Sequence, residues 1–328
     1  MNHIKESWKT KGYADEALPE GIDLHEEIRR LCREKKAVIM AHYYTESDIQ
    51  DVADFVGDSL ALAQKAAQTD ADIIVMCGVH FMAETVKLLC PDKTVLLPDA
   101  DAGCSLADSC DPDDFARFIV DHPGHTVISY VNTPVGVKAL SDILVTSGNA
   151  LKIVESMPAD AKIIFGPDRN LGAYINACTG RDMLPWDGAC HVHERFSAEG
   201  IIKLKEEFPD APVLVHPECP RPVLLLADKV GSTAALLAYA SESPAGRFIV
   251  ATESGILHKM QQACPDKTFI PAPPTDSTCG CNECAYMKLN TLAKLRDCLA
   301  AGAPEVTVDP ALAARARRSV DRMLELSK

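Results

Sequence analysis

Short, uniformly apolar runs alternate along the chain with longer segments that have the length of helices. The apolar runs 37–41, 73–77 and 94–97 predict strands, and the segments 24–35 and 81–90 predict helices. Apolar residues fill consecutive positions of each strand, which is typical of parallel strands covered on both faces. We therefore expect an α/β fold with parallel sheets.

Polar residues mark where further helices begin. Ser47 or Asp48 caps a predicted helix that runs toward Gln68, with a break at 57–59. Asp111 followed by Pro112 predicts another helix start. Near the end of the chain, the segment 305–308 predicts a strand, and Asp309 with Pro310 caps a final helix.

The same order of sequence features occurs three times, over 74–104, 163–190 and 249–279. Each copy has an apolar run, a polar turn, a helix-length segment ending near a Cys, a second apolar run and a further Cys. The landmark residues Cys90, Cys178 and Cys264 lie 88 and 86 positions apart. A repeat of this size indicates one supersecondary unit used three times.

This repeat sets the expected domain organisation. We predict three homologous α/β/α units with parallel sheets in a pseudo-threefold arrangement around a common centre. The expected boundaries are an N-terminal extension over 1–36, α/β repeats over 37–123, 124–210 and 211–304, and a C-terminal strand and helix over 305–328.

Composition narrows the possible partners. The chain has 328 residues and a net charge of −14, which argues against nucleic acid and against an anionic membrane surface. There is no GxGxxG or Walker A pattern, no apolar signal region near the start and no run long enough to span a bilayer. We expect a cytoplasmic protein, and a small acidic substrate is still compatible with the charge.

Thirteen cysteines is a high number for such a chain, and an odd number does not suit a disulfide framework. Cys90, Cys178 and Cys264 precede the last strand of their units, and we expect buried packing thiols there. Cys104, Cys190 and the group Cys279, Cys281 and Cys284 follow that strand, at the edge where ligands bind open parallel sheets. Three units around one axis would bring one thiol group from each together.

Converging thiolates indicate a metal centre. Structural zinc usually takes paired C-x2-C ligands, and only Cys281 and Cys284 offer such a pair. Single ligands from distant loops suit a [4Fe–4S] cluster better than zinc. With three protein ligands, one iron would keep an open position and act as a Lewis acid. Which cysteine of the third group takes part is open on these grounds.

Polar residues follow the first strand of every unit at equivalent places. His42 and Tyr44, Tyr130 and Asn132, and His216 and Glu218 are types that move or position protons. Hydroxyl groups recur near the next helix starts, where helix N-termini would bind anions and where simple N-capping is the alternative. These are Ser59, Ser147, Ser232 and Thr233.

Together, the motifs AHYY, GDSLALA, AGCSLAD, YVN, TSGNA, DGACHVHERF, HPEC, GSTAALL and CNECAYMKLN make the chain resemble the quinolinate synthases over about residues 37–300. The resemblance implies three α/β units around a [4Fe–4S] cluster held by three cysteines. It implies condensation of iminoaspartate with dihydroxyacetone phosphate to quinolinate, with loss of phosphate and water. It also implies L-aspartate oxidase as the metabolic partner that supplies iminoaspartate.

Matched motif by motif, the resemblance assigns the cluster ligands to Cys104, Cys190 and Cys284. Cys279 and Cys281 are then spare thiols, whose C-x-C spacing departs from the C-x2-C-x2-C of some family members. The active-site positions implied are His42, Tyr44, Ser59, Tyr130, Asn132, Ser147, His216, Glu218, Ser232 and Thr233.

The roles expected at these positions follow from their chemistry. Tyr44 with His42 would transfer protons on the triose-derived part, and Glu218 with His216 would act as base. Tyr130 and Asn132 would position the intermediate, while the hydroxyl groups would hold the substrate's anionic groups.

Two other functions fit parts of the pattern. Another [4Fe–4S] hydro-lyase would share every feature except the substrate. A non-enzymatic iron–sulfur sensor would share the cysteines but would not need the polar residues at the strand ends. A radical enzyme is disfavoured, because Cys279-x-Cys281-x2-Cys284 lacks the three-then-two spacing of that class.

Overall fold

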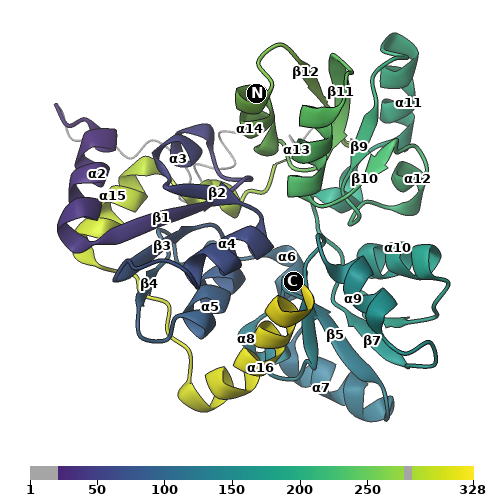
Figure 1. The fold of residues 1–328 in the computed structure, drawn as a ribbon, viewed down its shortest axis with the longest axis horizontal. Coiled ribbons are helices and arrows are strands. Elements are labelled where there is room, and N and C mark those ends of the chain that lie inside the picture. Colours follow the sequence, from purple (N-terminus) through teal and green to yellow (C-terminus); the bar gives the residue numbers. More distant parts are fainter. Residues whose placement is uncertain (1–20, 277–282) are drawn as a thin grey trace.

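The computed structural model describes residues 21–276 and 283–328 and consists of three α/β lobes around a common centre (Figure 1). Each lobe is built on its own four-stranded sheet, and all strand pairs within the three sheets are parallel. This confirms the predicted fold class. Helices pack on both faces of each sheet, which is why the strands are apolar at consecutive positions.

The three sheets share one topology. The first lobe has the order β2-β1-β3-β4, the second β6-β5-β7-β8 and the third β10-β9-β11-β12. The strands are β1 (Ala37–His42), β2 (Phe55–Gly57), β3 (Ile73–Cys77), β4 (Thr94–Leu96), β5 (Thr126–Tyr130), β6 (Ile143–Val145), β7 (Ile163–Gly166), β8 (Leu184–Pro185), β9 (Val213–Val215), β10 (Lys229–Val230), β11 (Arg247–Ala251) and β12 (Thr268–Pro271).

Helices connect successive strands of each sheet, and α15 and α16 follow the last strand. The helices are α2 (Leu24–Lys35), α3 (Ser47–Val52), α4 (Ser59–Ala66), α5 (His80–Leu89), α6 (Ser105–Asp108), α7 (Pro112–Asp121), α8 (Val135–Lys138), α9 (Ala150–Ser156), α10 (Arg169–Thr179), α11 (Ala198–Glu207), α12 (Arg221–Leu224), α13 (Thr233–Glu242), α14 (Ile256–Ala263), α15 (Leu292–Ala301) and α16 (Pro310–Leu326), with short 3-10 helices η1 (His193–Arg195) and η2 (Met287–Leu289).

The helix predicted from 47 toward 68 is only partly confirmed: its break covers 53–58 rather than 57–59, and Glu46, not Ser47 or Asp48, is the N-cap residue of α3. The segment 47–68 forms α3, the short strand β2 and α4, because Asp54 stops α3 and turns the chain back onto the sheet. Asp54 Oδ2 accepts the N–H of Ile39 at 2.8 Å, 15 residues away. Asp142 accepts Val127 N–H and Asp228 accepts Val213 N–H at the same spacing and distance. Every lobe therefore repeats this carboxylate and the edge strand beside it.

The C-terminal segment also differs from expectation. Residues 305–308 form no named strand; Glu305 makes only an isolated antiparallel bridge to Leu96. The final helix is as predicted, since Asp309 Oδ1 caps the N–H groups of Ala311 and Leu312 at 3.0 Å. α16 then packs against α8, β6 and α5, so the end of the chain joins the first and second lobes (Figure 1).

The apolar core is not equally divided among the lobes. One continuous cluster of buried side chains runs from the first lobe through the second and includes Val320 and Met323 of α16. The third lobe has separate clusters on the two faces of its sheet. Among the described residues, none of the helices has the length and apolar character needed to cross a membrane.

The three landmark cysteines do not share one environment. Cys90 and Cys264 are buried and end their helices as C-cap residues. Cys178 is exposed, so the expectation of a packing thiol was wrong there. The reason is that α10 runs on to Thr179 and ends at Gly180, whose φ of 68° is the left-handed conformation that glycine adopts easily. Cys178 therefore lies inside the last helical turn.

Candidate functional site

The carboxyl ends of the three sheets meet around a cavity of about 660 Å³. Its walls come from all three lobes. The lining residues are His42, Tyr44, Asp58, Ser59, Val79, Phe81, Cys104, Tyr130, Asn132, Thr146, Ser147, Cys190, Val192, His193, His216, Glu218, Thr233, Glu253, Cys284 and Met287.

The structure brings the residues singled out from the sequence to this cavity, with one exception. Ser232 is absent from the lining; it is buried behind it, where its Oγ caps α13 by accepting the N–H of Ala235 at 3.3 Å. Its neighbour Thr233 faces the cavity. Cys279 and Cys281 lie outside the described residues.

The first-strand histidines of the first and third lobes are held by the same local turn. Nδ1 of His42 accepts the N–H of Tyr44 at 3.2 Å, and Nδ1 of His216 accepts the N–H of Glu218 at 3.4 Å. Nε2 of His216 lies 3.2 Å from Ser147 Oγ, a residue of the second lobe. Burial lowers the pKa of both imidazoles to about 3, so both rings are neutral at pH 7.

Tyr44 is tied to the third lobe through its hydroxyl. That oxygen lies 2.7 Å from Thr233 Oγ1 and 2.8 Å from Thr252 Oγ1. Burial raises the pKa of Tyr44 well above its usual value, against the smaller effect of these two hydrogen bonds. The group therefore carries its proton and can donate it to a ligand in the cavity.

Glu218 is the charged centre of the site. Tyr130 donates its hydroxyl proton to Oε1, and His193 Nδ1 lies 3.1 Å from Oε2. Burial by itself raises the pKa of Glu218, but His193, His216 and these hydrogen bonds outweigh it and bring the pKa to about 2. Burial and the Glu218 charge raise the pKa of Tyr130 well above its usual value. The pair is thus a carboxylate with a phenol donor.

These contacts join into one buried chain of polar groups. His193 Nε2 lies 2.9 Å from Thr252 Oγ1, which links the Glu218 end to Tyr44. The imidazole rings of His193 and His216 stack with centroids 4.4 Å apart. A connected chain of this kind positions each group and offers paths for protons.

Two buried oxygen atoms in the lining have no hydrogen-bond partner among the described residues. They are Asn132 Oδ1 and Thr146 Oγ1. Buried polar atoms in proteins are nearly always hydrogen-bonded, so such atoms mark positions where a polar ligand would bind.

The three cysteines assigned as ligands share a second local design. Cys104 precedes α6, Cys190 precedes η1 and Cys284 precedes η2. The backbone N–H groups of the residues two or three positions later face each thiol: Leu106 and Ala107, His193, and Tyr286 and Met287. Each thiol thus lies at the N-terminus of a helical turn, where the backbone N–H groups favour the negative charge of a thiolate.

The same three thiols line one cavity. Burial raises the pKa of Cys104 to about 12 and that of Cys284 to about 11, and raises that of Cys190 well above its usual value. Neighbouring thiols are among the further causes for Cys104 and Cys190. Buried thiolates in such proximity need cationic metal to stay charged. The donor set, one thiol from each lobe with amide groups behind it, fits an iron–sulfur cluster.

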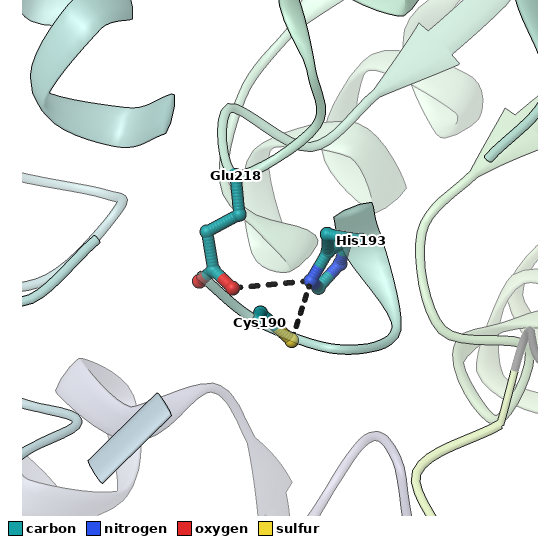
Figure 2. Close-up of side chains that lie close together, drawn as sticks. All are labelled: Cys190, His193 and Glu218. Carbon is teal, nitrogen blue, oxygen red and sulfur yellow. Dashed lines mark hydrogen bonds and ion pairs between the residues drawn. The ribbon is translucent and has the colours of Figure 1, made fainter. Parts of the chain in front are cut away.

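A second donor set shares Cys190. One ligand atom each from Cys190, His193 and Glu218 lie within 4.8 Å of one another, and Figure 2 shows the three side chains converging. His193 Nδ1 stands between the others, 3.3 Å from Cys190 Sγ and 3.1 Å from Glu218 Oε2. Mixed sulfur, nitrogen and oxygen ligands of this kind suit zinc.

Comparison with known proteins decides the family. A family model described as quinolinate synthetase A protein matches residues 26–325. The chain belongs to this family. It is 57% identical over 311 residues to quinolinate synthase of Microcystis aeruginosa, covering 95% of this chain and 97% of the relative.

Other quinolinate synthases match as extensively. The protein of a Synechococcus strain is 56% identical over 305 residues, covering 93% of this chain and 95% of its own length. That of Chloroherpeton thalassium is 55% identical over 307 residues, covering 94% and 95%. The matches span all three lobes, and the resemblance read from the motifs is confirmed.

The helix starts in this quinolinate synthetase A family member differ from expectation. Asp58, not Ser59, caps α4, with Oδ1 3.0 Å from the N–H of Ala61. The N–H of Ala234 and the hydroxyl of Ser232 at the start of α13 also face this carboxyl group and lower its pKa, although burial raises it overall. A carboxyl group of the chain thus already occupies the N-termini of α4 and α13.

Sequence reasoning missed several lining or supporting residues. His193 stands in the quoted motif DGACHVHERF, but only its cysteine was singled out. Glu253 lies two residues after β11 and pairs with the buried Lys288, whose Nζ is 3.3 Å from Oε1. Burial raises the pKa of Glu253 to about 7, against the opposing effect of Lys288. The signal for Glu253 was its position one turn beyond a central strand.

Proposed function

We propose that this protein is a quinolinate synthase that condenses iminoaspartate with dihydroxyacetone phosphate and releases phosphate and water. The observation that carries the proposal is the central cavity, where three thiols from three lobes meet the neutral imidazoles of His42 and His216, two phenols and the carboxylate of Glu218. The names of relatives that are 55–57% identical over most of the chain support the substrate assignment.

In this proposal Cys104, Cys190 and Cys284 hold a [4Fe–4S] cluster. When bound, the cluster supplies one iron without a protein ligand, a Lewis acid that assists loss of hydroxide during the final dehydration. The amide groups behind each thiol stabilise its negative charge.

Tyr44 and His42 act together on the triose-derived part of the substrate. The phenol keeps its proton because it is buried, and its hydroxyl is oriented by Thr233 and Thr252. His42 accepts an amide N–H at Nδ1, so the neutral ring carries its proton on Nε2. The pair can donate one proton and accept another as phosphate leaves and the carbon–carbon bond forms.

Glu218 with His216 is the proposed base for the carbon beside the leaving hydroxyl. Its pKa of about 2 makes it a weak base before substrate binds. Two substrate carboxylates in the same buried cavity raise that pKa, because like charges disfavour the ionised form. Tyr130 and Asn132 position the intermediate, and the unpartnered Asn132 Oδ1 accepts a hydrogen bond from it.

Hydroxyl groups hold the anionic groups of the substrates. Ser59, Ser147 and Thr233 line the cavity from different lobes, and Ser232 keeps α13 in place behind them. A helix N-terminus contributes about 0.3–1 kcal/mol, far below the ~8 kcal/mol of micromolar binding. Because Asp58 already faces two of these N-termini, direct hydrogen bonds from hydroxyl and amide groups carry most of the anion binding.

The proposal includes an L-aspartate oxidase as the metabolic source of iminoaspartate. The test is anaerobic incubation of the iron-loaded protein with dihydroxyacetone phosphate and freshly generated iminoaspartate, with quinolinate measured by chromatography and mass. We expect quinolinate only when both substrates are present. A protein with full iron and sulfide that forms no quinolinate would contradict the substrate assignment, and the alternative would then be a hydro-lyase for another substrate.

One observation favours a second candidate for the metal. Cys190, His193 and Glu218 are close enough to share a single ion. A mononuclear site there would contain no sulfide and would leave Cys104 and Cys284 without a metal. The cluster is preferred because each of those two thiols has the same amide support as Cys190.

A further inference from the structure

Two lobes place a buried carboxyl group at the same point of the fold. The strand register aligns Ala41 with Cys77, Ser129 with Gly166, and Val215 with Ala251. Two residues beyond the last member of each pair stand Val79, Asp168 and Glu253, respectively. The first is apolar, while Asp168 and Glu253 are both completely buried.

Each carboxyl group lies beside the ligand loop of its own lobe. The N–H of Cys284 donates to Glu253 Oε1 at 3.0 Å. The backbone N–H of Cys190 faces Asp168 and is among the groups that lower its pKa. In the third lobe the acid accepts the N–H of the cysteine directly. In the second lobe Asp168 lies near the peptide group of Cys190, while its Oδ1 caps α10 by accepting the N–H of Leu171.

Glu253 is fixed from three sides. Oε2 accepts the N–H of Gly255 at 2.7 Å, while Oε1 accepts Cys284 N–H and faces Lys288 Nζ at 3.3 Å. Lys288 is itself part of the ligand turn, since its N–H donates to the carbonyl of Cys284 at 3.2 Å. A Cβ at Gly255 would lie 2.8 Å from Oε2, so the close approach of the carboxyl group to this peptide requires a glycine at 255.

We propose that Glu253, paired with Lys288, is a positioning residue that holds the Cys284 thiol toward the central cavity by binding its peptide N–H. The proposal rests on the proposed function in one respect, that Cys284 is a cluster ligand. Glu253 does not need to touch substrate for this role, since it acts through the backbone of the cysteine and the turn that follows.

The pair spans the turn at both ends, from the amide of Cys284 to the side chain of Lys288 four residues later. With both groups buried, no solvent can replace the lost contacts. Partners that orient a metal ligand typically change metal affinity by about 10–100-fold when removed. If Cys284 were no longer held in position, only Cys104 and Cys190 would hold the cluster firmly.

The test compares two double variants that each remove a buried Glu–Lys pair. Glu253→Leu with Lys288→Met deletes the pair at the ligand turn and keeps the site neutral, so no unpaired charge is buried. Glu84→Leu with Lys138→Met is the matched control. Lys138 Nζ lies 3.8 Å from Glu84 Oε2, and that carboxylate also accepts a backbone N–H, but from Val135, which is no ligand. Lys138 does interact electrostatically with the Cys104 thiol, but the control pair holds the peptide group of Val135 rather than that of a ligand cysteine.

Two readouts are taken on anaerobically prepared full-length protein. The first is the rate of iron release to a chelator, which we expect to rise about 10–100-fold in the Glu253 variant and to stay within about twofold of wild type in the control. The second is hydrogen exchange of the Cys284 amide in metal-free protein. We expect faster exchange over 283–289 in the Glu253 variant alone.

The outcomes separate this inference from the proposed function. If both double variants release iron at the same rate, or if Cys284 exchange is unchanged without Glu253, the positioning role is wrong. If wild type itself binds no iron and sulfide, the proposed function fails. In that case the exchange data still decide whether Glu253 holds the peptide group.

Discussion

Replacing His42 with Asn should reduce the loss of stability that the metal-free protein suffers on acidification. Asn can keep the local turn, since its carbonyl oxygen can accept the N–H of Tyr44 as Nδ1 does. What it removes is an imidazole that is buried in its neutral form. Burial lowers the pKa of His42 from 6.5 to about 3.

The sign and size of the effect of His42 on stability follow from the different proton uptake of the folded and unfolded chains. Between pH 6.5 and 3 the unfolded chain protonates this histidine and the folded chain does not, so acid favours unfolding. The slope is about 1.4 kcal/mol per pH unit for each such group. From pH 6.5 to 5 the contribution of His42 is about 2 kcal/mol, and His216 contributes in the same direction.

Glu253 has the opposite effect on the stability of the folded protein in part of this pH range. Its pKa is raised from 4.5 to about 7, so the folded protein takes up a proton first and gains stability as the pH falls toward 4.5. The quantity to compare is therefore the difference between wild type and variant, in which this effect cancels.

The assay is urea unfolding followed by circular dichroism at several pH values from 6.5 to 5. We expect the stability of His42→Asn to fall by about 2 kcal/mol less than that of wild type over this interval. His80→Asn, at an exposed position in α5, is the control for the substitution itself. If wild type and His42→Asn lose the same amount of stability over this pH interval, the inference that His42 is buried as a neutral imidazole is wrong.

Three further changes test the roles proposed for the cavity. Tyr44→Phe removes the hydroxyl that bridges Thr233 and Thr252, and kcat should fall about 10²–10⁴-fold with iron content unchanged; full turnover would exclude a proton-transfer role. Glu218→Gln should lower kcat by at least about 100-fold, and a fully active variant with intact cluster would refute the base assignment. Asn132→Ala should raise KM about tenfold with a smaller change in kcat, because its Oδ1 is free for a ligand; an unchanged KM would remove Asn132 from binding.

Much of the fold could be predicted because the repeat and the periodicity agree. Strand β3 and helices α2 and α16 have the bounds or caps expected from their apolar runs and Asp residues. The edge strands β2, β6 and β10 were missed because two or three residues are too few to show a period. Their position depends on Asp54, Asp142 and Asp228, which act across 15 residues.

The site was partly predictable for a different reason. Residues at strand ends, such as His42 and Glu218, follow from chain order once parallel sheets are assumed. Glu253, two residues after β11, could have been found in the same way, but Lys288 and its pairing with Glu253 could not, because they depend on how a turn after β12 packs against the loop after β11. The burial of Cys178 was wrongly predicted because α10 runs on to Thr179 and ends at Gly180. Cys178 therefore lies within the helix, at an exposed position, and not at its end.

The most direct test of the central claim is the iron and acid-labile sulfide content of anaerobically purified protein. The account predicts about four of each per chain in wild type. It predicts loss of both in Cys104→Ala, Cys190→Ala and Cys284→Ala. A single metal ion without sulfide, or full content in Cys104→Ala, would contradict a cluster held by one thiol from each lobe.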